Sequence, residues 1–235
     1  MNKLAVFVEG QTEQVFVERL LREIAGNKEI EIKDCRPTGR RKGKPTHLHI
    51  EASTADSRNK FFVLIVDCGG DERVKSLIRD NYDSLVKKGY QAIIGIRDVF
   101  PEQRANIPKL RAGLHYRMKT VPIQVEFILA VMEIEAWFIA EYTHFRRLSN
   151  RLTVERIQSE IGFDPSTDDI ELRDHPSEDI RNIYQLAGFA YNKSKTNVQR
   201  TVGLLDYANI YVELGQKIND LNCLLEQIDA FLSNG

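Results

Sequence analysis

Three acidic residues that each follow an apolar stretch are the first candidates for chemistry. Glu9 comes directly after LAVFV, Asp67 after FFVLIV and Asp98 shortly after AIIGI. If these stretches are parallel strands, their carboxyl ends meet at the edge of the sheet where ligands bind. Converging carboxylates repel each other, and a divalent cation most readily keeps them together. The three acids therefore predict a Mg²⁺ site suited to phosphoryl chemistry, although acids at strand ends can also simply face water.

The elements that would position these acids alternate between strands and helices. The apolar runs FFVLIV and AIIGI are typical of strands buried on both faces, whereas EIEIK alternates like a half-exposed strand. The predicted strands span residues 4–8, 29–33, 61–66, 92–96 and 123–131, the last being either a strand or a strand that runs into a helix. A helix that begins after an N-cap at Thr12 follows the first strand, and helices are predicted over residues 72–88 and 107–119.

Strand signals fade after residue 133, and the rest of the chain is predicted to be mainly helical. The predicted helices there span residues 133–142, 154–161, 177–189, 192–205 and 213–232, with a loop over residues 162–179. Alternating strands and helices favour crossover connections and a parallel sheet. The predicted fold class is therefore α/β, with a mostly parallel, Rossmann-like sheet. The predicted domains are an α/β domain over residues 1–145 and a helical carboxy-terminal region, residues 146–235, packed on it.

Three segments in order carry a resemblance to a known family. They are VEGQTEQVFVERLL (8–21), VDCGGD (66–71) and EIEAWFIAE (133–141). The chain resembles the Toprim fold and, more closely, small stand-alone bacterial Toprim-like proteins related to the overcoming-lysogenization-defect (OLD) nucleases. The resemblance covers about residues 1–145 and implies a site that binds Mg²⁺ or Mn²⁺ and acts on phosphodiester bonds.

The resemblance also implies roles for individual acids. Glu9 matches the family glutamate, a metal ligand or general acid/base, and Asp67 matches the first aspartate of an Asp-x-Asp pair. The second aspartate is missing, because Gly69 stands at its position. Either Asp71 or Asp98 supplies the other ligand, or the site is degraded.

The segment MEIEAWF adds a further acidic pair. The resemblance puts it near the metal edge, so that Glu133 or Glu135 reaches the site. Alternatively, Glu133 forms an ion pair with an arginine such as Arg97. A spacing of two places both glutamates on one face of a strand, or well apart on a helix.

Two cationic features are candidates for phosphate contacts. Lys193 lies in the Tyr191-Asn192-Lys193 element, which resembles one in the same small proteins and offers a catalytic cation; an exposed helical lysine is the alternative. The stretch RPTGRRKGK (36–44) is a candidate nucleic-acid-binding loop, and a solvated surface loop is equally compatible with it. Its binding candidates are Arg40, Arg41, Lys42 and Lys44.

Composition narrows the class of protein. The 33 Lys and Arg residues nearly balance the 34 Asp and Glu residues, so any polyanion site must be a local patch. The three cysteines, Cys35, Cys68 and Cys223, match neither a disulfide framework nor a zinc spacing and favour a cytoplasmic protein. The longest apolar runs, such as Phe127–Met132, are far too short to cross a membrane.

The leading functional hypothesis is a Mg²⁺- or Mn²⁺-dependent nuclease or a related phosphodiester-acting enzyme. The resemblance alone suggests a role in defence against foreign DNA. The expected partner is nucleic acid, with DNA favoured and RNA left open, and a partner ATPase and a homodimer are both compatible with the sequence. Two alternatives stay open. One is a degenerate, non-catalytic Toprim module that binds nucleic acid or a partner protein, which Gly69 favours. The other is a small-molecule phosphohydrolase, although the chain has no glycine-rich phosphate loop.

Overall fold

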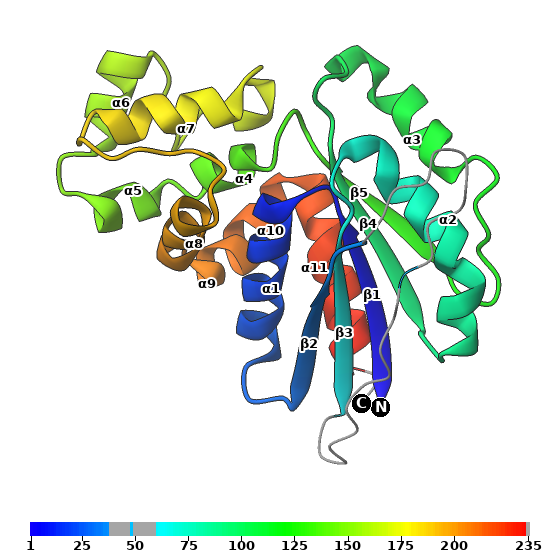
Figure 1. Cartoon of the computed structure of the whole chain (residues 1–235). Helices are drawn as coiled ribbons and strands as arrows, with labels where there is room; N and C mark the ends of the chain where they lie inside the picture. The colour runs from blue at the N-terminus through cyan, green and yellow to red at the C-terminus, as the bar shows by residue number, and fades with distance from the viewer. Residues whose placement is uncertain (38–47, 49–59, 234–235) are drawn as a thin grey trace. The chain divides into compact units, whose positions relative to one another are not determined.

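The computed structural model describes residues 1–37, 48 and 60–233. The described part is α/β, with a five-stranded parallel sheet of order β2-β3-β1-β4-β5 (Figure 1), so the predicted fold class is confirmed. The predicted nucleic-acid-binding residues Arg40, Arg41, Lys42 and Lys44 lie outside the described residues. None of the described helices is long and apolar enough to span a bilayer.

The chain divides into two compact units, each assembled from non-consecutive segments. The first unit comprises residues 1–97, 108–129 and 224–235, and the second comprises residues 98–107 and 130–223. These units do not coincide with the predicted domains, because residues 98–107 and 130–145 fall in the second unit and residues 224–235 fall in the first.

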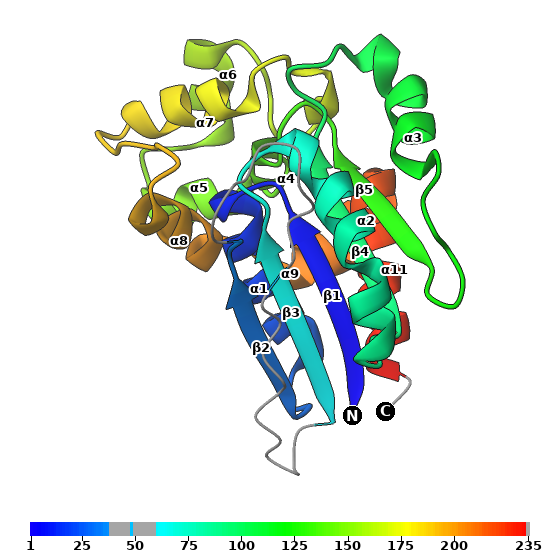
Figure 2. The ribbon, with the colours of Figure 1, turned by 45° about the vertical axis from the view of Figure 1, so that its right-hand side comes forward.

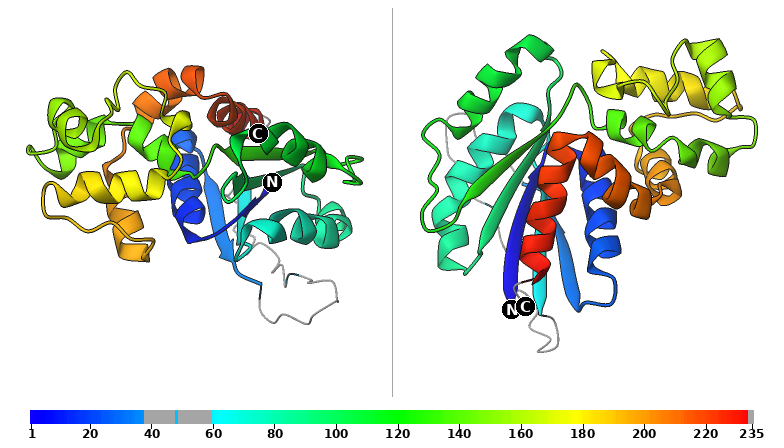
Figure 3. Two further views of the ribbon diagram at one scale, coloured as in Figure 1. Left: turned by 90° about the horizontal axis from the view of Figure 1, so that it is seen from above. Right: turned by 180° about the vertical axis from the view of Figure 1, so that it is seen from behind.

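The first unit holds the sheet and the helices that cover it. Helices α1 and α11 lie on one face of the sheet and α2 lies on the other (Figures 1 and 3). Its elements are β1 (Asn2–Val8), α1 (Gln11–Ala25), β2 (Ile30–Cys35), β3 (Phe61–Asp67), α2 (Asp71–Lys87), β4 (Ala92–Asp98), α3 (Ile107–His115), β5 (Val125–Ala130) and α11 (Asn219–Ser233). The boundary between the units cuts four of these elements: the first unit contains β4 up to Arg97, α3 from Pro108, β5 up to Leu129 and α11 from Leu224.

The register of the central strands aligns their carboxyl ends. Val8 of β1 pairs with Asp67 of β3 on one side and with Ile96 of β4 on the other. Every residue of β3 is buried, as expected for a parallel strand covered on both faces (Figure 2). Continuous apolar character thus places β1, β3 and β4 at the centre of the sheet.

Helix α1 begins earlier than predicted. Gly10, not Thr12, is the N-cap, and Thr12 lies inside the first turn with only 3% of its surface exposed. The backbone N–H of Gly10 donates to Glu13 Oε2 at 2.8 Å. The prediction of an N-cap at Thr12 was wrong, because the Glu13 carboxylate accepts the Gly10 N–H and so stabilises a helix start at Gly10.

Close packing around Gly95 joins β4 to its neighbours. A Cβ atom built on Gly95 would lie 2.8 Å from the Phe127 ring of β5 and 2.9 Å from the Ile78 side chain of α2. Elsewhere in this core, the Phe61 and Phe231 rings meet edge to face, with centroids 5.4 Å apart. The sheet and its helices are therefore packed too tightly at Gly95 to admit a methyl group.

We expect Gly95→Ala to destabilise the protein by about 1–3 kcal/mol, because the added methyl group overpacks this core. Gly113→Ala, in helix α3 where an added Cβ meets nothing within 4 Å, is the matched control. It should stabilise the protein by roughly 0.5–1 kcal/mol through helix propensity. Urea unfolding measures both changes, and equal effects of the two variants would contradict the packing argument.

The second unit is built of short helices. Its elements are η1 (Arg104–Asn106), α4 (Glu135–Ala140), α5 (Thr143–Leu148), α6 (Val154–Ile161), η2 (Ile170–Leu172), α7 (Pro176–Gln185), α8 (Lys195–Leu204), α9 (Tyr207–Asn209), the π-helical turn η3 (Ile210–Leu214), α10 (Gly215–Lys217) and the start of α11. The single helix predicted over residues 213–232 is wrong, because Ile218 adopts an extended backbone between α10 and α11.

A buried polar cluster organises the middle of this unit. Glu141 is fully buried, and its carboxylate accepts hydrogen bonds from the Thr143 hydroxyl and from the backbone N–H of Asp206 at 3.1 Å. His144 is also fully buried, with Nδ1 2.6 Å from the Glu141 carbonyl oxygen. Burial raises the pKa of Glu141, whereas burial lowers the pKa of His144 to about 4 and so keeps the imidazole neutral at physiological pH.

This cluster predicts a loss of stability in mild acid. Because the folded pKa of His144 lies below its unfolded value, stability present above pH 6.5 is lost as the pH falls towards about 4. The full loss amounts to about 3 kcal/mol. His144→Asn removes the titration and should flatten this part of the unfolding free energy, measured by urea unfolding across the pH range. Parallel pH curves for the two proteins would contradict the assignment.

Candidate functional site

The carboxyl ends of β1 and β3 bring Glu9 and Asp67 to neighbouring positions in the first unit. The N–H of Cys68 donates to the Val8 carbonyl at 2.9 Å, and the N–H of Gly70 donates to the Glu9 carbonyl at 2.9 Å. The turns that follow the two strands are thus hydrogen-bonded to each other. Asp67 is buried, whereas Glu9 is half-buried.

Asp67 is held by a cation and a backbone amide. Arg36 Nη2 lies 2.5 Å from Asp67 Oδ2, and the N–H of Gly69 donates to Asp67 Oδ1 at 2.9 Å. The adjacent Cys68 thiol stays protonated, because burial, and after it the charge of Asp67, raise its pKa. Cys68 therefore fills space as a small apolar side chain and is not a nucleophile.

The backbone at Gly69 explains why glycine occurs at this position. Gly69 has φ of +68°, in the left-handed region that disfavours other residues. A Cβ there would also lie 3.2 Å from the Arg73 guanidinium. Asp71 is the first residue of α2, and its side chain lies outside the described part of the structure.

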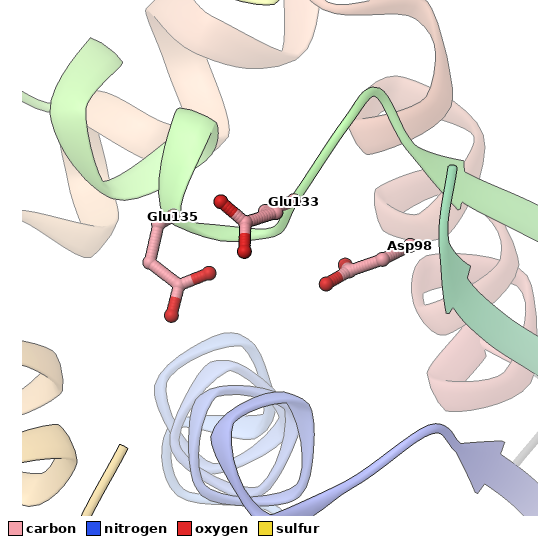
Figure 4. Close-up of side chains that lie close together, drawn as sticks. All are labelled: Asp98, Glu133 and Glu135. Carbon is pink, nitrogen blue, oxygen red and sulfur yellow. The ribbon is translucent and has the colours of Figure 1, made fainter. Parts of the chain in front are cut away.

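Three buried carboxylates come together in the second unit. Asp98 ends β4, Glu133 lies in the connection between β5 and α4, and Glu135 is the first residue of α4 (Figure 4). One oxygen from each lies within 4.8 Å of the other two. The exposed fractions are 4% for Asp98, 8% for Glu133 and 0% for Glu135. We refer to these three residues as the acidic triad.

The backbone around the acidic triad fixes its geometry. The N–H of Val99 donates to the Ala130 carbonyl at 2.9 Å, and the N–H of Phe100 donates to the Met132 carbonyl at 2.8 Å. The N–H of Ile134 then donates to Asp98 Oδ1 at 2.9 Å. Met132 has φ of +60°, a conformation that costs a non-glycine residue about 1–2 kcal/mol. The turn at Met132 thus places Glu133 and Glu135 close to Asp98.

A second group of polar contacts surrounds the glutamates. The backbone N–H of Ser177, in the first turn of α7, donates to Glu133 Oε2 at 2.8 Å, where the helix dipole favours negative charge. The hydroxyl of buried Tyr191 donates to Glu135 Oε1 at 2.9 Å. Lys193 Nζ lies 3.4 Å from Glu133 Oε1 and 3.6 Å from Glu135 Oε1. The lysine side chain is 49% exposed, so the cation that contacts the two glutamates is also accessible to solvent.

The structure unites some of the predicted site residues. Asp98, Glu133 and Lys193 lie together with Glu135, whereas Glu9 and Asp67 belong to the first unit. The predicted roles of Glu9, Asp67 and Asp71 as metal ligands stay predictions. Sequence reasoning did not assign Tyr191 to the site, and its only signal was the position two residues before Lys193.

The acidic triad offers an all-oxygen donor set. Oxygen ligands suit hard cations such as Mg²⁺, Mn²⁺ and Ca²⁺. Lys193 forms ion pairs with two of the carboxylates, and packing three carboxylates together in a buried position is costly unless positive charge compensates them. The residues present thus fit a divalent cation held by one or more of the three carboxylates.

Comparison with known proteins gives the family of the chain. Among curated proteins, none matches significantly. A solved structure described as the crystal structure of hypothetical protein PH0156 from Pyrococcus horikoshii OT3 superposes with a TM-score of 0.54 at 16% identity, over 97% of this chain and 99% of that one. At this identity the likeness concerns the fold alone. The model of the domain of unknown function DUF4276 matches residues 8–203, and the chain therefore belongs to the DUF4276 family.

Proposed function

We propose that the protein is a Mg²⁺- or Mn²⁺-dependent phosphodiester hydrolase, a nuclease acting in the cytoplasm. One observation carries the proposal: three buried carboxylates, with oxygens within 4.8 Å of one another, face a half-exposed lysine. The Toprim resemblance, DNA as the substrate, a partner ATPase and a role in defence stay predictions that agree with this chemistry.

The proposed metal ligands are Asp98, Glu133 and Glu135. The bound cation would neutralise phosphate charge and lower the pKa of a coordinated water. The protein's own contribution is to hold the ligands before the cation arrives. The Ile134 and Ser177 amides orient Asp98 and Glu133, and the Tyr191 hydroxyl orients Glu135. Such outer contacts fix ligand direction and strengthen metal binding.

Lys193 is the proposed contact to the substrate phosphate. Its ammonium group already lies at the carboxylates, while half of its side chain is exposed. A short shift of this flexible side chain would bring the charge to a phosphate oxygen beside the metal. A cation at that point stabilises the negative charge that develops during phosphoryl transfer.

The metal site is tested by titration with Mn²⁺. Asp98→Asn should weaken Mn²⁺ binding by about ten-fold or more, because one charged ligand is lost. Asp179→Asn is the matched control, since Asp179 is a buried aspartate of the same unit that pairs with Arg173. Calorimetry measures both affinities. Equal Mn²⁺ affinity in Asp98→Asn and the parent protein would refute the triad as a metal site.

The catalytic role is tested with Lys193→Met. Removing the ammonium group should raise Mn²⁺ affinity several-fold, because a competing positive charge 3.4 Å from a ligand oxygen disappears. Metal-dependent nicking of supercoiled plasmid should nevertheless fall about a hundred-fold or more.

These two readouts separate the proposed role of Lys193 from a structural one. A lysine that merely balances charge would change Mn²⁺ affinity and leave the nicking rate at saturating metal unchanged. Hydrolysis of bis(p-nitrophenyl) phosphate without any plasmid nicking would instead favour a small-molecule phosphohydrolase. Absence of hydrolysis of both substrates by the parent protein, with Mn²⁺ bound, would contradict the enzymatic proposal.

A further inference from the structure

The segment from Gln103 to Val125 carries only positive charge. It contains no Asp or Glu, yet the chain as a whole has a net charge of −1. Within the first unit the segment supplies four cations, namely Lys109, Arg111, Arg117 and Lys119. A local excess of four positive charges creates a positive electrostatic potential, although the net charge of the whole chain is close to zero.

Helix α1 of the first unit contrasts with this segment, because its arginines are neutralised within the helix. In α1, Arg19 pairs with Glu23 at 2.6 Å and Arg22 pairs with Glu18 at 2.8 Å, both across one helical turn. Helix α3 has no carboxylate with which to form such pairs. Ordinary solvation of a helix therefore does not explain the charge pattern of α3 and the loop that follows it.

An exposed aromatic ring lies among these cations. Tyr116 is 62% exposed, and the Arg117 guanidinium lies 5.1 Å from its ring centroid. Val121, further along the same loop, is 84% exposed. The surface thus combines positive charge with uncovered apolar groups.

Helix α2 holds this surface in place. Lys75 Nζ donates to the carbonyls of Gly113 at 2.6 Å and Tyr116 at 2.8 Å, so the end of α3 is tied to α2 (Figure 2). Asp83 of α2 accepts from Lys119 at 2.8 Å, which also links the loop after α3 to α2. We call Lys75, Lys109, Tyr116, Arg117 and Lys119 the α3 surface.

We infer that the α3 surface binds single-stranded nucleic acid. Its lysines and arginine match backbone phosphates, and the exposed Tyr116 ring offers a face on which an unpaired base stacks. A duplex keeps its bases stacked inside, so it can use the cations but not the ring. This inference deepens the proposed function, because it names the substrate class of the nuclease, and it rests on different residues.

The test is fluorescence anisotropy with a labelled single-stranded DNA oligonucleotide in the presence of chelator, which prevents cleavage. The triple variant K109Q/R117Q/K119Q should bind about ten-fold or more weakly, and the slope of log affinity against log salt should fall by about 2. Tyr116→Ala should weaken binding of the single strand several-fold and leave binding of a duplex of the same sequence unchanged.

A matched control removes the same charge elsewhere in the first unit. R19Q/R22Q/K28Q also deletes three exposed cations, and it should leave affinity nearly unchanged if the α3 surface is the site. The variant R40Q/R41Q/K42Q tests the predicted basic loop independently. Unchanged affinity and salt slope in the α3 triple variant, or equal losses in it and the R19Q/R22Q/K28Q control, would overturn the inference.

Failure of this inference is distinguishable from failure of the proposed function. Mn²⁺ affinity and bis(p-nitrophenyl) phosphate hydrolysis depend on the acidic triad, and the α3 triple variant should leave both unchanged. Conversely, Asp98→Asn should retain its affinity for the single strand in chelator. Oligonucleotide binding lost in Asp98→Asn but retained in the α3 variant would place the binding site at the triad and refute the α3 surface.

Discussion

The second unit must compensate the electrostatic repulsion among three buried carboxylates. Asp98, Glu133 and Glu135 lie close together, and donors from several parts of the chain compensate their charge. The Ile134 amide, the Ser177 amide at the start of α7 and the Tyr191 hydroxyl each take one oxygen, and Lys193 adds a positive charge. Removing one donor leaves a buried negative charge poorly compensated, which typically costs several kcal/mol. The short helices α4 and α7 are therefore tied to this cluster as much as to apolar packing.

The central strands could be predicted from the sequence because their apolar runs have one physical explanation. FFVLIV and AIIGI are too short for buried helices and too apolar for exposed strands, and the structure places them in β3 and β4. The start of α1 could not be predicted, because Glu13 stabilises a glycine cap that a search for Ser, Thr, Asp or Asn passes over. The break at Ile218 was equally hidden, since apolar periodicity continues on both sides of it.

The candidate site was partly visible in the sequence. Asp98 was found because it follows a strand, and Lys193 because of a resemblance. The joint contribution of Glu133 and Glu135 was not derivable, since spacing arguments assume a strand or a helix and Glu133 lies in neither. The left-handed backbone at Met132 turns the chain there, and no local pattern encodes it. The excess of positive charge in and after α3 can be counted in the sequence. Only the exposure of Tyr116 and the hydrogen bonds from Lys75 distinguish this surface from an ordinary solvated helix.

The order of the two units along the chain has a consequence for biosynthesis. The long segment of the second unit, residues 130–223, interrupts a first unit whose last portion begins at Leu224. Until residues 224–233 take their place, the sheet lacks the part of α11 that carries the Phe231 ring packed on Phe61. The later half of the polypeptide can thus reach its native contacts before the earlier half does. A nascent chain that lacks residues 224–233 would leave part of one sheet face uncovered beside α1.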